Sequence, residues 1–475
     1  MTTAELERPL LGGTDGWRAL VADEPGVGLM NDETVAGMTH AFVGRQLERG
    51  IEGPVVVARD TRSSGEALSR AAIAGALAQG VEVIDLGVIP TPGAQRFATK
   101  VGASTTAMLT ASHNGAEYNG LKLMVGNAKP DKAEVRGTSD DYWRQVDSGL
   151  VIPLSLADQG REMRVDAREE YIQDIVADII RAFPNKSGKL PLEDKFFVVD
   201  GANGAAMSIT PEVFRRLGAR VEEFCCDGSR PINENCGAAK LGGLKEFLAD
   251  NQNIAKHPDF IGAVANDGDA DRFMGVGIVN GEPVEITGNH VMEAMAKHPK
   301  QPGIVGTIYT NSGMTERLQV AGVDFEYCDN GDTYVTNALL AKQAADLEWT
   351  RGGEFTGHLI DTTWLTSGDG VRSAAWFAAW SVSQNATFGD IHKAMPMWPE
   401  KMLSVELKSP VKGNIMDYAP VHTVIDLAKK EGMRPIVRAS GTEPLVRAWV
   451  EGQEKSGVNR AAKRIAEAVR SSLTT

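Results

Sequence analysis

The chain repeats one short pattern three times: a helical stretch, a glycine and a β-rich run. The copies are ALAQGVEVIDL at 76–86, RRLGARVEEF at 215–224 and RLQVAGVDFEYC at 317–328. Glycine commonly follows the last turn of a helix, and a short β-branched run after it predicts a strand. Two copies also follow an apolar run that ends in a polar loop, VVVARD at 55–60 and FFVVDG at 196–201. We therefore predict three related α/β domains.

The C-terminal part of the chain has a different pattern from the three α/β repeats. A length of 475 residues exceeds that of one ordinary domain, so we expect several hydrophobic cores. Near the C-terminus, residues 402–409 and 434–452 alternate apolar and polar side chains, and 459–473 have the period of an amphipathic helix. This pattern predicts a smaller α+β domain. The polar, turn-rich stretch 126–165 predicts one short helical piece followed by a linker between the first two domains.

Composition restricts the possible partners. The formal net charge is −14 and the pI is near 5.2, which argues against general affinity for nucleic acid or anionic membrane. No signal segment is evident at the N-terminus, and the apolar stretch 374–380 is too short to cross a bilayer, so we expect a cytoplasmic protein. The four cysteines show neither CxxC nor histidine spacing for zinc, and we expect buried, reduced thiols.

The first chemistry-bearing stretch is TASHNGAEYNGLKLM at 110–124. Small and turn-forming residues surround Ser112, which predicts an exposed, presented hydroxyl. A serine needs activation to act as a nucleophile, and the sequence lacks the GxSxG elbow of many hydrolases. His113 and Lys122 are candidates to handle protons or to balance the charge of a phosphate. Taken alone, the stretch is also compatible with an ordinary hydrogen-bonded turn.

A second stretch, NDGDADRF at 266–273, follows the apolar run IGAVA. Asp267, Asp269 and Asp271 alternate, and carboxylates this close repel one another unless a cation lies between them. Hard oxygen ligands suit Mg²⁺ or Ca²⁺. An EF-hand loop needs glycine at position six and glutamate at twelve, where this chain has Arg272 and Ile278, so an EF-hand is excluded. The alternative is a solvated acidic turn.

Two further loops are candidates for binding a polar ligand. RGGEFTGH at 351–358 offers Glu354, Thr356 and His358 as donors and acceptors for sugar hydroxyls, although a glycine-rich turn between elements would look the same. Near the N-terminus, GGTDGWR at 12–18 has an aspartate and an arginine in a glycine-bounded loop and means little by itself.

The last candidate loop is RASGTEPLVR at 438–447. Two arginines flank hydroxyls and backbone N–H groups, an arrangement typical of an anion nest. There is no GxxxxGK[ST] sequence, so a nucleotide-binding P-loop is not indicated. A surface turn with incidental arginines remains the alternative. The residues concerned are Arg438, Ser440, Gly441, Thr442 and Arg447.

In their order and wording, these loops resemble the motifs of the α-D-phosphohexomutase superfamily, of the TASHNP, DGDADR, GGExSGH and SGTEP types. The resemblance covers nearly the whole chain. It implies three α/β domains with mixed sheets and a smaller C-terminal α+β domain around a central cleft. We place them at 1–160 (serine loop), 161–281 (metal loop), 282–396 (sugar loop) and 397–475 (phosphate loop).

The resemblance also implies roles. Ser112 would carry a phosphoryl group and would ligate Mg²⁺ together with Asp267, Asp269 and Asp271. Arg18, His113, Lys122 and Arg272 would be the basic residues of the active site. The hexose phosphate substrate and the hexose bisphosphate intermediate would be bound by Glu354, Thr356, His358, Arg438, Ser440, Gly441, Thr442 and Arg447. The protein would act as a monomer or homodimer.

The hexose itself is a separate question. Stretches such as INENCG at 232–237 and NGDTYV at 330–335 resemble the glucosamine phosphate branch of the superfamily, so interconversion of glucosamine 6-phosphate and 1-phosphate is expected. Phe355, Thr356 and Thr333 depart from that branch, which leaves glucose and mannose phosphates as alternatives. A phosphosugar-binding protein without catalysis is a further alternative, disfavoured by the serine and the three aspartates.

Overall fold

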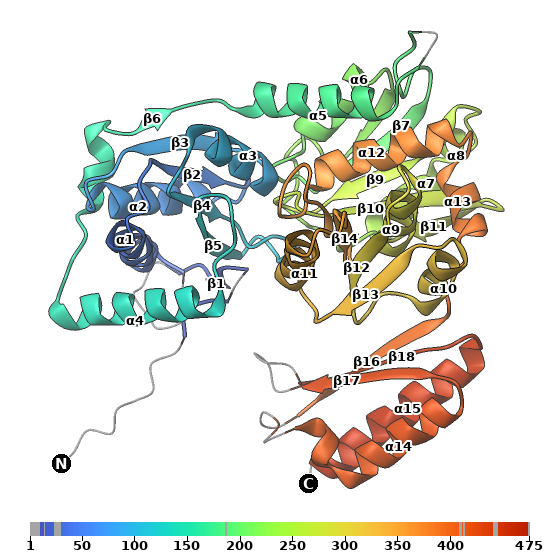
Figure 1. Ribbon diagram of the computed structural model, residues 1–475. Helices are drawn as coiled ribbons and strands as arrows, with labels where there is room; N and C mark the ends of the chain where they lie inside the picture. The colour runs from blue at the N-terminus through green and yellow to red at the C-terminus, as the bar shows by residue number, and fades with distance from the viewer. Residues whose placement is uncertain are drawn as a thin grey trace. The chain divides into compact units, whose positions relative to one another are not determined.

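The computed structural model describes residues 10–13, 15–22, 30–185, 188–407, 411, 414–439 and 445–473. The chain divides into two compact units, Met1–Tyr309 with Val323–Ala394, and Thr310–Gly322 with Met395–Thr475. Three mixed sheets lie in the first unit and an antiparallel sheet in the second (Figure 1). The predicted mixed α/β class is confirmed. The boundaries of the four predicted domains stay a prediction.

The first sheet has six strands and is flanked by helices. Its strand order is β1–β5–β4–β2–β3–β6, with β5 antiparallel to both of its neighbours and the other pairs parallel. The strands are β1 (Trp17–Leu20), β2 (Val55–Arg59), β3 (Val83–Val88), β4 (Thr105–Leu109), β5 (Tyr118–Val125) and β6 (Met163–Arg164). The helices are α1 (Asp32–Glu48), α2 (Gly65–Leu77), α3 (Thr91–Val101), α4 (Lys132–Ser148) and the 3₁₀ helix η1 (Leu154–Gln159).

The second and third sheets have the orders β11–β10–β9–β7–β8 and β13–β12–β14–β15. The second comprises β7 (Phe196–Asp200), β8 (Arg220–Phe224), β9 (Phe260–Asn266), β10 (Phe273–Val279) and β11 (Glu282–Ile286), with α6 (Ile209–Arg216), α7 (Gly242–Asp250) and α8 (Gln252–Ala255). The third comprises β12 (Gly303–Thr307), β13 (Asp324–Cys328), β14 (Arg351–Gly353) and β15 (Leu359–Asp361). Associated helices are α9 (Gly288–Lys297), α11 (Asp332–Ala344), α12 (Gly370–Ser383) and α13 (Phe388–Ala394).

The three sheets share one four-strand core. In sheet order these cores are β3–β2–β4–β5, β8–β7–β9–β10 and β13–β12–β14–β15, each with three parallel strands and a fourth antiparallel strand. The helix–glycine–strand patterns at 76–86, 215–224 and 317–328 therefore mark equivalent positions. The third of them includes α10 (Ser312–Val320), which belongs to the second compact unit.

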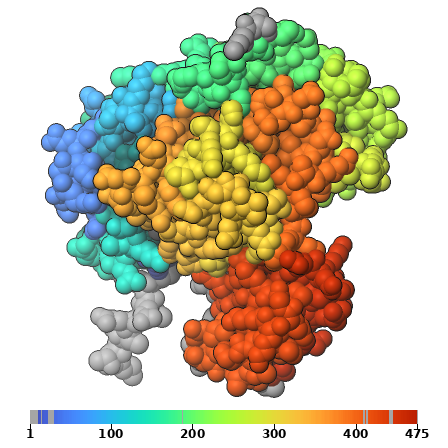
Figure 2. All heavy atoms as spheres, turned by 45° about the vertical axis from the view of Figure 1, so that its right-hand side comes forward, coloured from blue at the N-terminus to red at the C-terminus, as the bar shows by residue number. Residues whose placement is uncertain are grey.

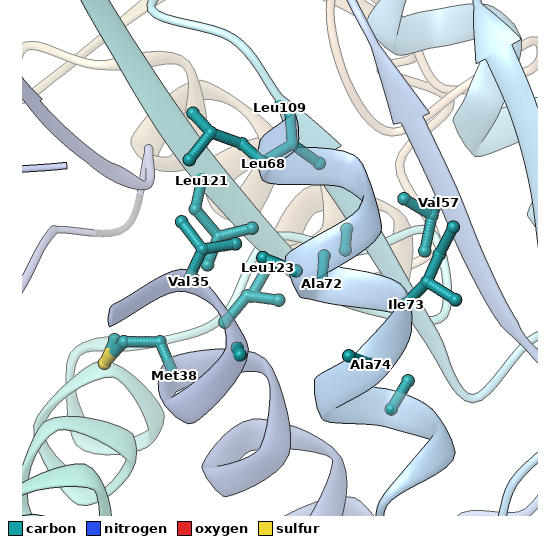
Figure 3. Packing of buried hydrophobic residues seen from close by; sticks show 14 of the residues in the cluster. Val35, Met38, Val57, Leu68, Ala72, Ile73, Ala74, Leu109, Leu121 and Leu123 are labelled. Carbon is teal, nitrogen blue, oxygen red and sulfur yellow. The ribbon is translucent and has the colours of Figure 1, made fainter. Parts of the chain in front are cut away.

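The core of the first sheet follows from strand alternation. Val57 and Leu109 face the cluster formed with α1 and α2, whereas Val56 and Met108 face the cluster on the α3 side. Because successive side chains point to opposite faces, a strand covered on both sides is apolar throughout. Figure 3 shows α1 and α2 side chains converging on the strands. Burial of each such aliphatic side chain contributes about 1.5–3 kcal/mol.

Helix α5 (Arg168–Ala182) joins the sheets of the first unit. It contacts α3 beside the first sheet and α6 and α12 farther along (Figure 1). The Tyr171 hydroxyl donates to Asp369 Oδ1 at 2.8 Å, and Arg372 Nε donates to Asp178 Oδ2 at 2.7 Å. These buried polar contacts hold α5 against the start of α12.

The apolar stretch 374–380 lies inside α12, which packs on β9 and β10 and is buried. Figure 2 shows the orange surface of the chain around α12 and α13 beside the yellow surface around α9 and β11, and these elements are in contact. Within the described part of the chain, no helix combines the length and the apolar character needed to cross a membrane.

The expectation of one short helical piece within 126–165 was wrong, because α4 has 17 residues. Its start is capped by Asp131, whose side chain accepts from the Glu134 backbone N–H. The Glu134 carboxylate then accepts from Arg45 and Gln46 of α1 and from Arg49, directly after its end. The sequence of α4 has little apolar periodicity, and its polar contacts to α1 hold it in place.

The second unit matches the α+β pattern predicted near the C-terminus. Its sheet order is β16–β18–β17, with every pair antiparallel. The Ser312 hydroxyl at the start of α10 donates to Glu451 Oε2 at 2.6 Å, which ties this helix to the sheet. The elements are β16 (Glu400–Glu406), η2 (Ile415–Asp417), α14 (Ala419–Lys430), β17 (Arg434–Ala439), β18 (Leu445–Glu451) and α15 (Lys455–Leu473).

Candidate active site

Three of the loops singled out in the sequence occupy the same place in the repeated core. Each connects the third strand of that core to the antiparallel fourth strand: β4 to β5, β9 to β10, and β14 to β15. The loops also meet in space. The Ser112 hydroxyl donates to Asp267 Oδ2 at 2.7 Å, and the Phe273 backbone N–H donates to the Gly357 carbonyl at 3.0 Å. One site is therefore built from three sheets.

Ser112 is buried and not exposed as the sequence suggested, since only 1% of it is accessible. Its φ is +52°, in the left-handed region that a serine adopts at a cost of about 1–3 kcal/mol. The Thr110 hydroxyl accepts from the Ser112 backbone N–H at 2.9 Å. The turn was predicted correctly, but the metal loop of another sheet covers the hydroxyl, and local sequence carries no sign of that cover.

Two residues that the sequence did not single out hold the serine loop. Arg62 is buried, pairs with Asp60 at 3.0 Å, and donates to the carbonyls of four loop residues: Ser112, Asn114, Gly115 and Tyr118. Asn233 Nδ2 donates to the Ser112 carbonyl at 2.8 Å from the second sheet's side. A signal existed for Arg62, because DTR directly follows the buried strand β2, and ligand sites gather at carboxyl ends of strands.

The aspartates form a buried triad. Asp267, Asp269 and Asp271 are each 1% exposed or less, and one carboxylate oxygen from each lies within 4.8 Å of the others. The Oδ1 atoms of Asp269 and Asp271 are buried and have no hydrogen-bond partner among the described residues. Buried carboxylate oxygens without partners are costly, and a hard divalent cation would satisfy them. The triad is therefore a metal site by its donor set.

The charged groups around the triad also indicate that it needs a cation. Burial, and then the neighbouring carboxylates of Asp271 and Asp269, raise the pKa of Asp267 to about 7. Lys122 Nζ lies 2.7 Å from Asp269 Oδ2 and 2.9 Å from Asp271 Oδ2. Burial disfavours its charged form, but these carboxylates keep the pKa of Lys122 well above its ordinary value. The predicted basic residue thus contacts two of the three aspartates.

Arg272 and His358 flank the triad on the side of the third sheet. Their backbones form an isolated β-bridge, and His358 Nε2 lies 3.2 Å from Asp271 Oδ2. Burial disfavours the imidazolium, but Asp271 and Asp332 outweigh it and raise the pKa of His358 to about 10. Arg272 Nε is buried without a hydrogen-bond partner in the described structure, 3.9 Å from Asp267 Oδ2. The Arg272 guanidinium can therefore donate a hydrogen bond to an additional anion.

His113 differs from His358. Its Nδ1 lies 3.4 Å from the Ser112 hydroxyl oxygen. Burial, and then the positive charges of Arg272 and Arg18, lower the pKa of His113 to about 4. The imidazole is thus neutral at physiological pH and can accept or donate a hydrogen bond beside the serine.

The sugar loop is held tightly against the metal loop. Gly357 has φ +90°, and a Cβ there would lie 2.1 Å from the Phe273 carbonyl oxygen, so only glycine allows this approach. Glu354 is buried and its Oε1 accepts from the Gly331 backbone N–H at 3.1 Å. Thr356 is partly exposed beside Phe355, whose ring centroid lies 6.1 Å from that of Tyr309.

A chain of charges connects the first and third sheets beside the site. Lys129 Nζ lies 2.5 Å from Asp15 Oδ1 and 2.6 Å from Asp332 Oδ2. Arg18 pairs with Asp15 as well, so the N-terminal loop that seemed uninformative in the sequence joins this network. Burial opposes ionisation of Asp15, but Lys129, Lys122 and Arg18 hold its pKa well below its ordinary value. The sequence analysis missed Lys129 and Asp332, which lie in different predicted domains.

The fourth loop is described in part. Arg438 on β17 and Arg447 on β18 are direct cross-strand partners and both are exposed. Cross-strand neighbours lie on the same face of a sheet, so the two arginine side chains stand next to each other. Ser440, Gly441 and Thr442 lie outside the described residues.

Comparisons with known proteins agree with this architecture. Three models of the phosphoglucomutase/phosphomannomutase family match: alpha/beta/alpha domain I at residues 9–138, alpha/beta/alpha domain III at 286–397, and the C-terminal domain at 419–468. Phosphoglucosamine mutase of Acidovorax ebreus is 35% identical over 473 residues, covering 96% of this chain and 98% of that protein. The enzyme of Pseudoalteromonas translucida is 32% identical, covering 97% of each.

Solved structures share the fold. A putative phosphomannomutase from Thermus thermophilus aligns with a TM-score of 0.74 at 21% identity, covering 97% of this chain and 99% of that one. Aspergillus fumigatus N-acetylphosphoglucosamine mutase, in complex with GlcNAc-6P and magnesium, aligns with a TM-score of 0.64 at 16% identity, covering 99% and 97%.

Proposed function

Because this chain belongs to the phosphoglucomutase/phosphomannomutase family and is therefore a phosphohexomutase, we propose that Ser112 carries the phosphoryl group that it transfers. An enzyme of this kind is an intramolecular phosphotransferase, an isomerase. Phospho-Ser112 would donate its phosphoryl group to the free hydroxyl of a hexose phosphate. The resulting hexose bisphosphate would reorient within the site, so that its other phosphoryl group faces Ser112. That group would then be transferred back to Ser112.

One observation carries the assignment: the 2.7 Å hydrogen bond between the Ser112 hydroxyl and Asp267 of the buried triad. A phosphoryl group on this oxygen would lie beside a metal site on one side and the unpartnered Nε of Arg272 on the other. Phosphoryl transfer needs charge on the equatorial oxygens to be offset, and metal ions and arginines supply that charge. The neutral His113 imidazole, 3.4 Å from the same oxygen, would exchange a proton with the serine or the sugar hydroxyl.

We assign Mg²⁺ to the triad. Three carboxylates and a serine oxygen are hard ligands, which suit Mg²⁺ better than a soft metal. The unpartnered Oδ1 atoms of Asp269 and Asp271 fit such an ion. The fungal N-acetylphosphoglucosamine mutase of the same fold was solved with magnesium. When bound, the ion would offset the negative charge of the phosphoryl group on Ser112.

The remaining predicted residues would bind the substrate. Glu354 and Thr356 would contact sugar hydroxyls, with His358 held beside them as an imidazolium by its carboxylate neighbours. The paired arginines Arg438 and Arg447 would bind the phosphate that is not being transferred, because two guanidiniums on one face match a phosphate dianion. Ser440, Gly441 and Thr442 would contribute hydroxyl and backbone donors to the same phosphate.

We propose glucosamine phosphate as the substrate, because the bacterial relatives named phosphoglucosamine mutase match almost the full chain at 32–35% identity. The second candidate is glucose or mannose phosphate. It is favoured by Phe355, which stands in the sugar loop with its ring near Tyr309 and has no side-chain donor or acceptor for an amino group.

The deciding experiment measures kcat/KM with glucosamine 1-phosphate, glucose 1-phosphate and mannose 1-phosphate, each with a trace of the matching bisphosphate and Mg²⁺. The proposal predicts the highest kcat/KM with glucosamine 1-phosphate. A preference for glucose or mannose phosphate would overturn the substrate assignment while leaving the mutase reaction intact. Absence of turnover on all three would contradict the reaction itself.

A further inference from the structure

Two cysteines and an aspartate form a second cluster of metal-ligating side chains in the second sheet. Asp200 ends β7 and Cys225 directly follows the end of β8, its parallel neighbour, where Asp200 is in register with Phe224. Cys236 comes from the loop that precedes α7. One ligand atom from each of Asp200, Cys225 and Cys236 lies within 4.8 Å of the other two.

The cluster is separate from the catalytic triad in its donor chemistry. Two sulfur donors and one oxygen suit a borderline-soft divalent cation such as Zn²⁺, whereas the three aspartates suit a hard one. Zn–S bonds of about 2.3 Å in tetrahedral geometry place two sulfurs roughly 3.8 Å apart. The Cys225 and Cys236 sulfur atoms lie within 4.8 Å of each other, so a small movement would bring them to this separation.

The carboxylate is oriented as a metal ligand would be. Asp200 is fully buried, its Oδ1 accepts from the Ala202 backbone N–H at 2.9 Å, and its Oδ2 accepts from the Gly237 backbone N–H at 2.7 Å. Each oxygen keeps a second lone pair. Backbone donors of this kind fix the orientation of ligating carboxylates and tune their metal affinity.

The cluster also has an entrance. Cys225 is partly exposed, whereas Cys236 is buried. The expectation of four buried cysteines thus holds for Cys236 alone, since Cys226 and Cys328 are partly exposed as well. Three protein ligands leave one tetrahedral position, which a water molecule reaching the partly exposed Cys225 would fill.

We propose that Asp200, Cys225 and Cys236 bind Zn²⁺ or a closely similar thiophilic cation, in a site additional to the Mg²⁺ site. No local sequence pattern indicates this site, because the cysteines are 11 residues apart and the aspartate lies 25 residues before the first of them. The ion would join the ends of β7 and β8 to the segment 226–235. That segment includes Asn233, whose side chain holds the Ser112 carbonyl.

The test uses the reduced full-length protein, freed of metal and supplied with excess Mg²⁺ to occupy the aspartate triad. Co²⁺ is titrated while thiolate-to-cobalt charge-transfer absorption is followed, since an all-oxygen site gives no such band. Zn²⁺ is then added to displace it. Wild type is expected to bind one equivalent, and Cys225→Ser and Cys236→Ser are expected to bind at least about tenfold more weakly.

Cys226→Ser is the matched control, because this neighbour's Sγ lies against the Val199 and Phe224 carbonyls instead of the cluster. It should bind Co²⁺ as wild type does. A second measurement needs no variant: bound Zn²⁺ should protect the partly exposed Cys225, but not the partly exposed Cys328, from alkylation, as peptide mass analysis reports. A missing charge-transfer band in wild type, an unchanged band in the Cys225 and Cys236 variants, or alkylation indifferent to Zn²⁺ would each overturn the site.

Discussion

The Ser112 hydroxyl donates a 2.7 Å hydrogen bond to Asp267, a residue 155 positions later in the chain. This contact joins the serine loop of the first sheet to the metal loop of the second. Both loops occupy the same position in a repeated four-strand core, which explains how one fold element, used several times, brings different chemical groups to one place.

Replacing Ser112 by alanine should abolish mutase turnover while the protein stays folded, because the hydroxyl is the proposed phosphoryl carrier. We expect a loss greater than the roughly 10³-fold that removal of one hydrogen-bond donor costs an enzyme. Turnover is measured with sugar phosphate and trace bisphosphate. Ser104→Ala is the control, since the hydroxyl of this buried serine donates to the Gly53 and Pro54 carbonyls, away from the serine loop. Ser112→Ala activity within tenfold of wild type would exclude the proposed role.

Arg62 should position the serine loop without touching substrate. Arg62→Lys keeps the charge beside Asp60 but cannot reach four carbonyls, so the loop should shift and kcat should fall about 10²-fold. Hydrogen exchange of residues 112–118 should accelerate in parallel. Arg70→Lys, an exposed arginine paired with Asp158, should leave both measurements unchanged. A kcat loss with unchanged exchange in the serine loop would contradict the positioning role.

These two residues also illustrate what sequence can and cannot predict. Ser112 and the three aspartates were found because turn-forming residues and alternating carboxylates are local patterns. Arg62 and Asn233 were missed because their role depends on carbonyls and side chains 50 and 121 residues away. The burial of Ser112 was mispredicted for the same reason, since its cover comes from another sheet. The strands β2, β7 and β9 were predictable from apolar runs, whereas β14 lies in a glycine-rich stretch that we expected to be a loop. The length of α4 was missed because it depends on ion pairs with α1.

Mg²⁺ should stabilise the protein through the aspartate triad. At about 100 times the dissociation constant, a ligand that binds only the folded state adds roughly 2.7 kcal/mol. Chelator should remove this increment and stop turnover. In Asp269→Asn the increase of Tm with added Mg²⁺ should disappear, whereas Asp259→Asn, a surface carboxylate paired with Arg220, should retain it. An unchanged Mg²⁺ response in Asp269→Asn, or full turnover in excess chelator, would count against the metal site.

The buried Arg372 should be a major source of stability and of acid sensitivity. It pairs with Asp178 of α5 and with Asp361, so Arg372→Met removes one cation from each of two carboxylates in a buried network. Asp178 keeps Arg181 and Asp361 keeps Arg351, and the free energy of unfolding in urea at neutral pH should fall by up to about 3–5 kcal/mol. Arg181→Met removes an exposed partner of the same Asp178 and should cost less than about 1 kcal/mol.

The free energy of unfolding lost in Arg372→Met should depend on pH because of Asp361. Burial opposes ionisation there, but Arg372 and Arg351 lower the pKa of Asp361 below its ordinary value. A lowered folded-state pKa stabilises the protein above the unfolded-state pKa, and this contribution is lost as pH falls through the folded-state value. The difference in free energy of unfolding between wild type and Arg372→Met should therefore become smaller below about pH 4. A difference that stays constant into acid would contradict the pairing.

The central claim is that a phosphoryl group moves between the hexose bisphosphate and Ser112. The most direct measurement incubates dephosphorylated enzyme with bisphosphate carrying isotopically labelled phosphate, then maps the label by peptide mass analysis. The account predicts one label per chain, on the peptide that contains Ser112, and its loss as hexose monophosphate is added. Turnover without label on the protein, or label on a residue other than Ser112, would contradict it.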